Sequence, residues 1–359
     1  MDFKAAESLF KNEKLNELAS TNEGAKYLRL RSLSRSKYLL DFLGQNGVDT
    51  ESLKVKDQLP TAFGLDVDLA AIDSFIKKNY EEERKIRRNK EEELFNELYK
   101  LKVFDWGGLH QNSLEKTIVD NYIKKIYSYD LIEKKIETDL QSSLRGYVLC
   151  SWYNHWTSIL IEDVFKDHKR VLPALGLIPK IDFFIDETPF DLKVTYLPEG
   201  YIAESRKSAG LKPELTLLKQ SARSLGIPID TELTPSDQLE NLWSKHNEFQ
   251  ASTSSTIIKE LEEFRFKLIS SIEEDPTGLI KWLYENQGIR RFDASNRFFI
   301  VLINSGNFFE GWKLKRALPL LKKATSEYLD TKKNIGKEVA FTWEGQAYQV
   351  KGDILVIKN

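Results

Sequence analysis

Asp182, Asp191 and Lys193 are the residues of this chain whose types and spacing point most directly to chemistry. Side chains alternate between the two faces of a strand, so Asp191 and Lys193 share one face of the segment 190–195. If the chain turns tightly at residues 186–187, position 182 pairs with position 191 and the two aspartates lie directly opposite each other. Two carboxylates about 5 Å apart repel by roughly 3 kcal/mol at an effective dielectric near 20. A divalent cation between them reverses the sign of that interaction, and such oxygen ligands suit Mg²⁺.

A helix is predicted just upstream of this hairpin, over residues 152–165. Asn154, Ser158 and Glu162 recur at intervals of four residues, so they form one polar line on an otherwise apolar helix. Such a line is expected where a helix faces a charged site. Residues 170–178 then supply a strand and a turn that lead into the hairpin. An alternative stays open, in which the register differs and the polar face of the hairpin is only hydrated.

The order of these pieces resembles the PD-(D/E)XK nuclease superfamily, whose best-known members are the type II restriction endonucleases. The resemblance rests on Glu162 in the helix, Asp182 as the first aspartate, and Asp191-Leu192-Lys193 as the (D/E)-x-K element. It implies that Asp182, Asp191 and Glu162 bind Mg²⁺. It also implies that Lys193 orients the attacking water, which makes these four residues the candidate catalytic set. The chain departs from the family pattern at Ile181, where a proline is usual, and in the short interval between the two aspartates.

The resemblance covers about residues 145–200 and implies both a fold and an activity. The implied fold class is α/β, a restriction-endonuclease-like mixed sheet flanked by helices, with a large helical N-terminal region and a helical insertion. The implied activity is Mg²⁺-dependent hydrolysis of double-stranded DNA by a homodimer, as in a sequence-specific type II restriction endonuclease. One alternative is a structure-specific repair or recombination nuclease of the same superfamily. Another is a non-catalytic helical DNA-binding protein in which the aspartates are structural.

Basic residues that could contact DNA phosphates occur in separate groups along the chain. One group lies in a helical segment without acidic residues, a second follows the hairpin, and an arginine pair could read guanine bases. These candidates are Lys26, Arg29, Arg31 and Arg35, then Lys207, Lys212, Lys219 and Arg223, then Arg290 and Arg291. A further basic group comprises Lys313, Lys315 and Arg316. Each helical group could equally be a solvated face that is balanced by acidic residues elsewhere in the fold.

The elements that must position these residues divide the chain into two regions. Residues 1–108 are predicted to be a helical N-terminal region for DNA contact, recognition or dimerisation, with a boundary at Trp106-Gly107-Gly108. It contains one long predicted helix over about 65–103, whose charged middle indicates a solvated face or, alternatively, a coiled-coil arm. Residues 109–359 are predicted to be the catalytic domain, with a helical insertion over about 230–290.

The core of the second region is expected to be a mixed sheet with helices on its faces. Its predicted strands lie around 170–196 and 296–304, and its predicted flanking helices span 148–168, 211–225 and 309–329. The continuous apolar run 296–304 is typical of a central strand. Pro319 is expected to kink or split the last helix. A C-terminal hairpin should turn at Glu344-Gly345 and be followed by a separate strand over 353–357.

Composition favours an intracellular globular protein. The 359 residues are 41% hydrophobic and 30% charged, with a formal net charge of −2. The single cysteine, Cys150, excludes an internal disulfide and is expected to be buried among apolar neighbours. The absence of a signal peptide and of a long apolar run leads us to expect a cytoplasmic, prokaryotic protein with no membrane contact. The chain also lacks the glycine-rich, CxxC and GxSxG motifs, so no nucleotide cofactor, zinc ribbon or serine triad is expected.

Overall fold

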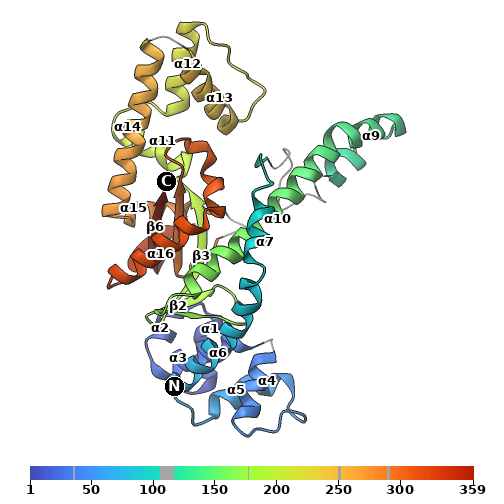
Figure 1. Ribbon diagram of the computed structural model, residues 1–359, viewed down its shortest axis with the longest axis vertical. Helices are drawn as coiled ribbons and strands as arrows, with labels where there is room; N and C mark the ends of the chain where they lie inside the picture. Colours follow the sequence, from blue (N-terminus) through green and yellow to red (C-terminus); the bar gives the residue numbers. More distant parts are fainter. Residues whose placement is uncertain (35–36, 106–115, 117, 177, 250–251, 289–291) are drawn as a thin grey trace.

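The computed structural model describes residues 1–359 except 35–36, 106–115, 117, 177, 250–251 and 289–291. It is a mixed α/β structure with a helical group at the N-terminal end, a mixed sheet between helices, and a projecting helical arm (Figure 1). The N-terminal helices are α1 (Phe3–Lys11), α2 (Leu15–Ala19), α3 (Asn22–Leu33), α4 (Lys37–Gln45), α5 (Val55–Gly64), α6 (Leu69–Arg88) and α7 (Glu91–Leu98).

The arm and the helices around the sheet make up the rest of the helical structure. The arm contains η2 (Val119–Ile123), α9 (Tyr129–Lys135), η3 (Ile136–Leu140) and the outer part of α10 (Gln141–Lys166). The remaining helices are α11 (Glu199–Ser208), α12 (Glu214–Leu225), α13 (Pro235–Glu248), α14 (Ser252–Glu274), α15 (Thr277–Glu285), η5 (Phe308–Arg316) and α16 (Leu318–Thr331). The predicted insertion helices correspond to α13, α14 and α15, whereas α11 was not predicted.

One open sheet contains six strands of the described chain, in the order β1-β2-β3-β4-β6-β5. The strands are β1 (Val171–Pro173), β2 (Phe183–Ile185), β3 (Thr188–Tyr196), β4 (Arg297–Ile303), β5 (Lys337–Trp343) and β6 (Gln346–Lys358). β3, β4 and β6 run parallel to one another, whereas the pairs β1–β2, β2–β3 and β5–β6 are antiparallel. The predicted mixed sheet is therefore confirmed, and the predicted central strand β4 is buried along its whole length.

Alternation of side chains along the strands separates two cores on opposite faces of the sheet. One core joins the β2–β3–β4 side chains Phe183, Phe190 and Phe298 to α10 and α16. The other joins Phe299 and Val301 of β4 to α14 and α15. Each fully buried aromatic or aliphatic side chain contributes about 1.5–3 kcal/mol relative to an exposed one. Burial on both faces fixes the register of β3 and β4, and so fixes which way the polar residues of β3 point.

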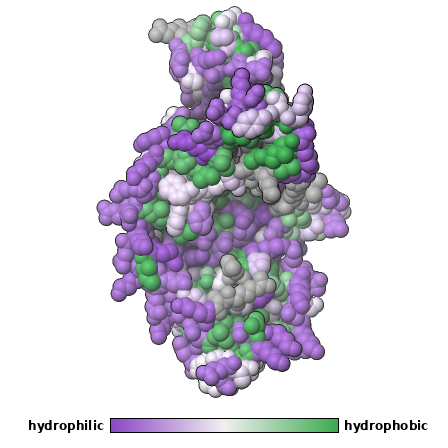
Figure 2. All heavy atoms as spheres, turned by 90° about the vertical axis from the view of Figure 1, so that its right-hand side faces the viewer, coloured by the Kyte–Doolittle hydropathy of each residue, from purple (hydrophilic) through white to green (hydrophobic). Residues whose placement is uncertain are grey.

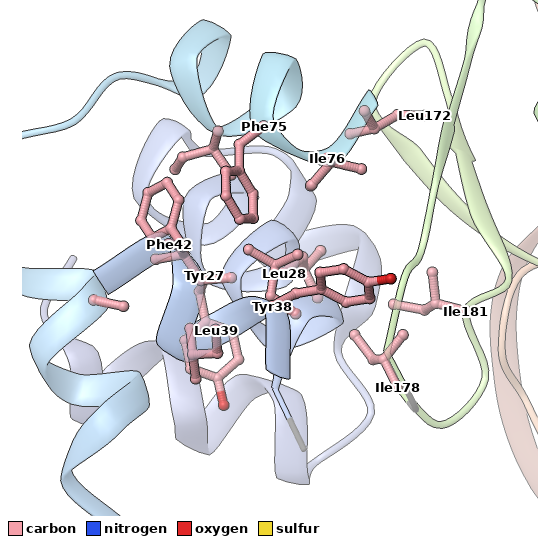
Figure 3. Close-up of a cluster of buried hydrophobic side chains, with 14 of the residues drawn as sticks. Tyr27, Leu28, Tyr38, Leu39, Phe42, Phe75, Ile76, Leu172, Ile178 and Ile181 are labelled. Carbon is pink, nitrogen blue, oxygen red and sulfur yellow. The ribbon is translucent and has the colours of Figure 1, made fainter. Parts of the chain in front are cut away.

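A third core fills the N-terminal helical region and reaches the hairpin strands (Figure 3). Tyr27 and Leu28 of α3 lie at its centre, and Leu172 and Ile181 enter it from the β1–β2 region. Phe184 of β2 belongs to the same core, whereas its neighbour Phe183 belongs to the core under α10. The hairpin is therefore held between the N-terminal helices and α10.

The predicted single helix over 65–103 is wrong, because α6 ends at Arg88 and α7 begins at Glu91. Its charged middle is also only partly solvated. Arg84 is 1% exposed and donates to Asp167 at 2.9 Å and to Glu91 at 2.6 Å. Arg84 also lies 3.5 Å from Asp163 of α10. The ion pairs of this charged network connect α6 and α7 to α10.

Five smaller predictions concern single residues or short segments. The predicted helix over 309–329 is split as expected, because η5 ends at Arg316 and α16 begins at Leu318. Pro319 occupies the first turn of α16, where proline is tolerated because no helical N–H bond is needed. The turn at Glu344-Gly345 is confirmed, with both residues at positive φ. Residues 353–357 continue β6 and are not a separate strand. The predicted burial of Cys150 is confirmed. The predicted boundary at Trp106-Gly107-Gly108 lies outside the described residues.

Candidate active site

The hairpin that carries the predicted site has the predicted turn. Asp186 and Glu187 connect β2 to β3 with φ values of 45° and 72°. Two consecutive residues at positive φ form the tight turn whose twist matches paired antiparallel strands. Phe183 then pairs with Phe190, which confirms the predicted register up to that position. The next residues along the two strands are Asp182 and Asp191.

The two strands part at these aspartates. β3 pairs with β2 up to Phe190 and with β4 from Asp191 onward. The backbone N–H of Asp182 donates to Phe190 at 2.8 Å, and the N–H of Leu192 donates to Asp182 Oδ2 at 2.7 Å. The side chain of Asp182 thus satisfies the N–H of β3 that β2 leaves unpaired. Polar side chains at the point where two strands diverge are more accessible to a ligand than polar side chains in the middle of a sheet.

Asp191 lies between two cations. Its Oδ1 atom is 2.5 Å from Lys193 Nζ, and its Oδ2 atom is 3.5 Å from Arg297 Nε. Arg297 pairs with Asp191 in the β3–β4 register and is buried. Lys193 has a side chain that is 45% exposed, so its ammonium can reach a substrate. Arg297 was not among the predicted site residues. The sequence signal that could have identified Arg297 is a charged residue at the start of an otherwise apolar strand. A buried charge needs a partner, so such a residue indicates an opposite charge nearby.

Glu162 contributes its charge to the same cluster from α10. It is half-buried and forms an ion pair of 2.8 Å with Lys166 one turn later. Burial and the neighbouring carboxylate of Glu162 raise the pKa of Asp182 to about 6. Asp191 raises that pKa further, whereas the hydrogen bond from Leu192 lowers it. The three predicted carboxylates therefore interact electrostatically.

The donor set fits a Mg²⁺ site built on two carboxylates. Mg²⁺ is commonly held by one or two carboxylates while water and phosphate oxygens complete its coordination. Asp182 and Asp191 provide two carboxylates, and burial, followed by the negative charges of Glu162 and Asp191, raises the pKa of Asp182. Within the described residues, no set of three or more His, Cys, Asp or Glu side chains is arranged to hold a metal ion. Glu162 and the two aspartates therefore do not form a three-ligand metal group in the described structure.

The predicted polar line of α10 runs from Glu162, beside the aspartates, to Asn154. Glu162 faces the aspartates, Ser158 is exposed, and the Oδ1 atom of Asn154 accepts a hydrogen bond of 2.7 Å from Lys315. Lys315 and Arg316 are both buried, so they are not part of an exposed basic patch. Arg316 donates to the backbone carbonyls of Leu98 and Leu101 at the end of α7.

The first predicted DNA-contacting group does not form an exposed patch in the described residues. Lys26 donates to the backbone carbonyl of Leu65. Arg29 is 3% exposed and bonds to Asp73 at 2.5 Å, because its helix face is packed inside the N-terminal core. Arg31 is half-buried and bonds to Ser34. Arg35 lies outside the described residues.

The other predicted DNA contacts are scattered. Lys207, Lys212 and Arg223 are exposed and Lys219 is half-buried. α12, which carries Lys219 and Arg223, lies at the top of Figure 1, whereas β2 lies below the middle, next to the N-terminal helices. Arg290 and Arg291 lie outside the described residues. The described structure therefore does not join these groups to the aspartate cluster in one basic surface.

A separate cleft of 770 Å³ lies at the carboxyl end of β3. Its lining includes Thr195 and Tyr196, and it carries the carboxylates Asp105, Glu199, Asp237, Glu240 and Glu310. Burial and nearby acidic residues raise the pKa of Glu240, as expected where several carboxylates share one cleft. Figure 2 shows a hollow lined by hydrophilic residues near the middle of the face on which the arm projects.

Comparison with protein-family models, with curated proteins and with solved structures finds no significant match to this chain. Among the described residues, no helix combines the length and the apolar character that a membrane crossing requires. The geometry of the aspartate cluster is therefore the main basis on which a function can be argued.

Proposed function

We propose that this chain is a Mg²⁺-dependent endonuclease that hydrolyses phosphodiester bonds in double-stranded DNA. The observation that carries the proposal is the position of Asp182 beside Asp191 where β3 leaves β2. A helix with a glutamate, a strand, and a hairpin with Asp and Asp-x-Lys occur here in the order on which the PD-(D/E)XK resemblance rests. In its finer form, the proposal is a restriction-endonuclease-like fold and a type II site-specific deoxyribonuclease, acting as a homodimer in a prokaryotic cytoplasm.

Each residue of the cluster has a defined task in this proposal. Asp182 and Asp191 hold the cation, and Glu162 adds negative charge that strengthens its binding. Bound Mg²⁺ supplies Lewis-acid stabilisation of the phosphate and lowers the pKa of water. Lys193 donates from its exposed ammonium to the scissile phosphate or the attacking water, where negative charge develops. Arg297 holds Asp191 in place from β4 and is a positioning residue.

A second candidate function is supported by the ion pairs of Asp191. Lys193 and Arg297 together already compensate its charge, as in a purely structural ion-pair cluster. In a helical DNA-binding protein without catalysis, these ion pairs would only stabilise the fold. The nuclease needs Mg²⁺ and the negative charge of Asp182 for its activity, whereas the non-catalytic DNA-binding protein needs neither.

The decisive experiment is incubation of long DNA of known sequence with the purified protein and either Mg²⁺ or EDTA. Asp182→Asn and Lys193→Met are compared with Glu187→Gln, which removes an exposed carboxylate from the same hairpin. We expect cleavage that needs Mg²⁺, is lost in the first two variants and persists in the control. Discrete fragments indicate a type II enzyme, and a smear indicates a structure-directed or non-specific nuclease. DNA binding without any cleavage, by folded protein, supports the non-catalytic candidate.

A further inference from the structure

Lys315 is a buried amine without an anionic partner among the described residues. It lies on η5, is 9% exposed, and has one hydrogen-bond partner there, the Oδ1 atom of Asn154 at 2.7 Å. Its Nζ atom also lies 5.5 Å from the centroid of the Tyr196 ring. Burial lowers the pKa of Lys315 to about 8, with no carboxylate to oppose the effect. A buried ammonium that lacks a counter-ion is costly unless a ligand supplies one.

Other hydrogen-bond donors gather around this amine. The hydroxyl group of Tyr196 is buried and has no hydrogen-bond partner among the described residues. Burial raises the pKa of Tyr196, and so do Tyr153 and Cys150, which lie on the same stretch of α10 as Asn154. Asn154 uses its oxygen for Lys315, which leaves its amide N–H groups free to donate. The site therefore has donors from β3, α10 and η5, and the acceptor described for them is the Oδ1 atom of Asn154, which is a neutral group.

The position of this donor site relates it to the aspartate cluster. Asn154 and Glu162 lie on one polar line of α10, two turns apart, which is about 12 Å along the helix. Along β3, Tyr196 follows Lys193 by three residues, which is about 10 Å, and this odd interval places the two side chains on opposite faces of the strand. Successive nucleotides of a duplex strand advance about 3.4 Å along the axis. The spacing of Asn154 and Glu162 along α10 thus corresponds to a few nucleotides of one strand.

We propose that Lys315, Tyr196 and Asn154 form a phosphate-binding site. Lys315 Nζ, the Tyr196 hydroxyl and the Asn154 amide donate to the phosphate oxygens, and the ammonium supplies the compensating charge. The phosphate can belong to a nucleic-acid strand that also reaches Asp182 and Asp191, a version that rests on the proposed function. It can otherwise be a free phosphate, which needs no nuclease activity.

Chemical protection of Lys315 tests the site without measuring activity. The intact protein is acetylated in EDTA with no addition, with inorganic phosphate, or with a duplex oligonucleotide, and acetylation at each lysine is followed by mass spectrometry. At a ligand concentration about ten times the dissociation constant, we expect acetylation of Lys315 to slow about tenfold. Lys323, whose side chain is 73% exposed, should be unaffected by phosphate. Tyr196→Phe should weaken protection by phosphate about tenfold, because one hydrogen bond to a charged group is lost.

The outcomes separate the two sources of phosphate. Protection by both ligands supports the nucleic-acid version, and Lys315→Met should then reduce the salt dependence of duplex binding by about 0.9 in the log–log slope. Protection by inorganic phosphate alone supports a free-phosphate site, even where the chain binds or cuts no DNA. Unchanged acetylation of Lys315 with both ligands overturns the proposal. Circular dichroism of Lys315→Met and Tyr196→Phe verifies that both variants are folded.

Discussion

The carboxylate of Asp182 accepts a hydrogen bond of 2.7 Å from the backbone N–H of Leu192. This bond bridges β2 and β3 where their backbone pairing ends, and it fixes the carboxylate beside Asp191. Asparagine can accept the same bond through its amide oxygen but carries no charge. Asp182→Asn therefore separates the structural contribution of this side chain from the contribution of its charge.

Asp182→Asn is expected to stabilise the folded protein at neutral pH when no metal is present. The pKa of Asp182 is raised to about 6 in the fold, from an ordinary value of 3.8, so the folded state retains a proton between these pH values. The stability associated with this group is present below about pH 3.8 and is lost as pH rises through about 6. The gain from the substitution is at most about 3 kcal/mol. It is measured by urea unfolding in EDTA at pH 4 and pH 8.

The critical quantity in this experiment is the difference between the stability gain at pH 8 and the stability gain at pH 4. We expect a clear gain at pH 8 and little gain at pH 4. A gain of the same size at both pH values would mean that burial of the charge at Asp182 does not destabilise the fold. Glu187→Gln, in the exposed turn of the same hairpin, is the control and should change stability little at either pH.

Mg²⁺ is expected to stabilise the wild-type protein and to lose this effect in Asp182→Asn. A ligand that binds only the folded state adds about 1.4 kcal/mol at ten times its dissociation constant. Thermal unfolding with Mg²⁺ and with EDTA at pH 8 measures the shift, and K⁺ at equal ionic strength controls for screening. An equal shift in the variant would place the bound cation somewhere other than the aspartate pair.

The charged network of α6 gives a prediction that is independent of function. Arg84 is buried and contacts Glu91, Asp163 and Asp167. Arg84→Ala leaves these carboxylates without their shared cation and is expected to cost about 3–5 kcal/mol. Arg88→Ala, on the same helix but half exposed, should cost less than about 1 kcal/mol. The two unfolding free energies, measured in urea, should differ accordingly, and similar values would show that the network contributes little.

The sequence could predict the hairpin but not its surroundings, for reasons that particular residues illustrate. The turn at residues 186–187 and the pairing of Phe183 with Phe190 follow from local alternation, which one strand pair determines by itself. Arg297 comes next to Asp191 only because β4 pairs in parallel with β3 after an interval of about a hundred residues. No local pattern encodes that register.

The charged residues were the hardest to interpret from the sequence. The absence of acidic residues around Arg29 indicated an exposed basic helix, yet Arg29 is buried against Asp73 of α6. The charged run around Arg84 indicated exposure to solvent, yet that guanidinium is paired with Asp163 of α10 and with Asp167, which directly follows this helix. Partners distant in sequence decide whether a long charged side chain is buried, and periodicity along one helix does not reveal them.

Lys315→Met is expected to stabilise the protein at pH 7 in the absence of phosphate. Burial lowers the pKa of Lys315 to about 8 from 10.5, so the unfolded chain binds the proton more tightly than the folded protein does. The stability associated with this amine is present above about pH 10.5 and is lost as pH falls through about 8. The methionine side chain fills similar space without a charge, so its advantage should be clear at pH 7 and should shrink towards pH 10. Lys323→Met, at an exposed position of α16, is the matched control and should show no such pH dependence. If the advantage of Lys315→Met is absent at pH 7 in phosphate-free buffer, the amine already has a counter-ion, and the unpaired donors around Asn154 and Tyr196 need another explanation.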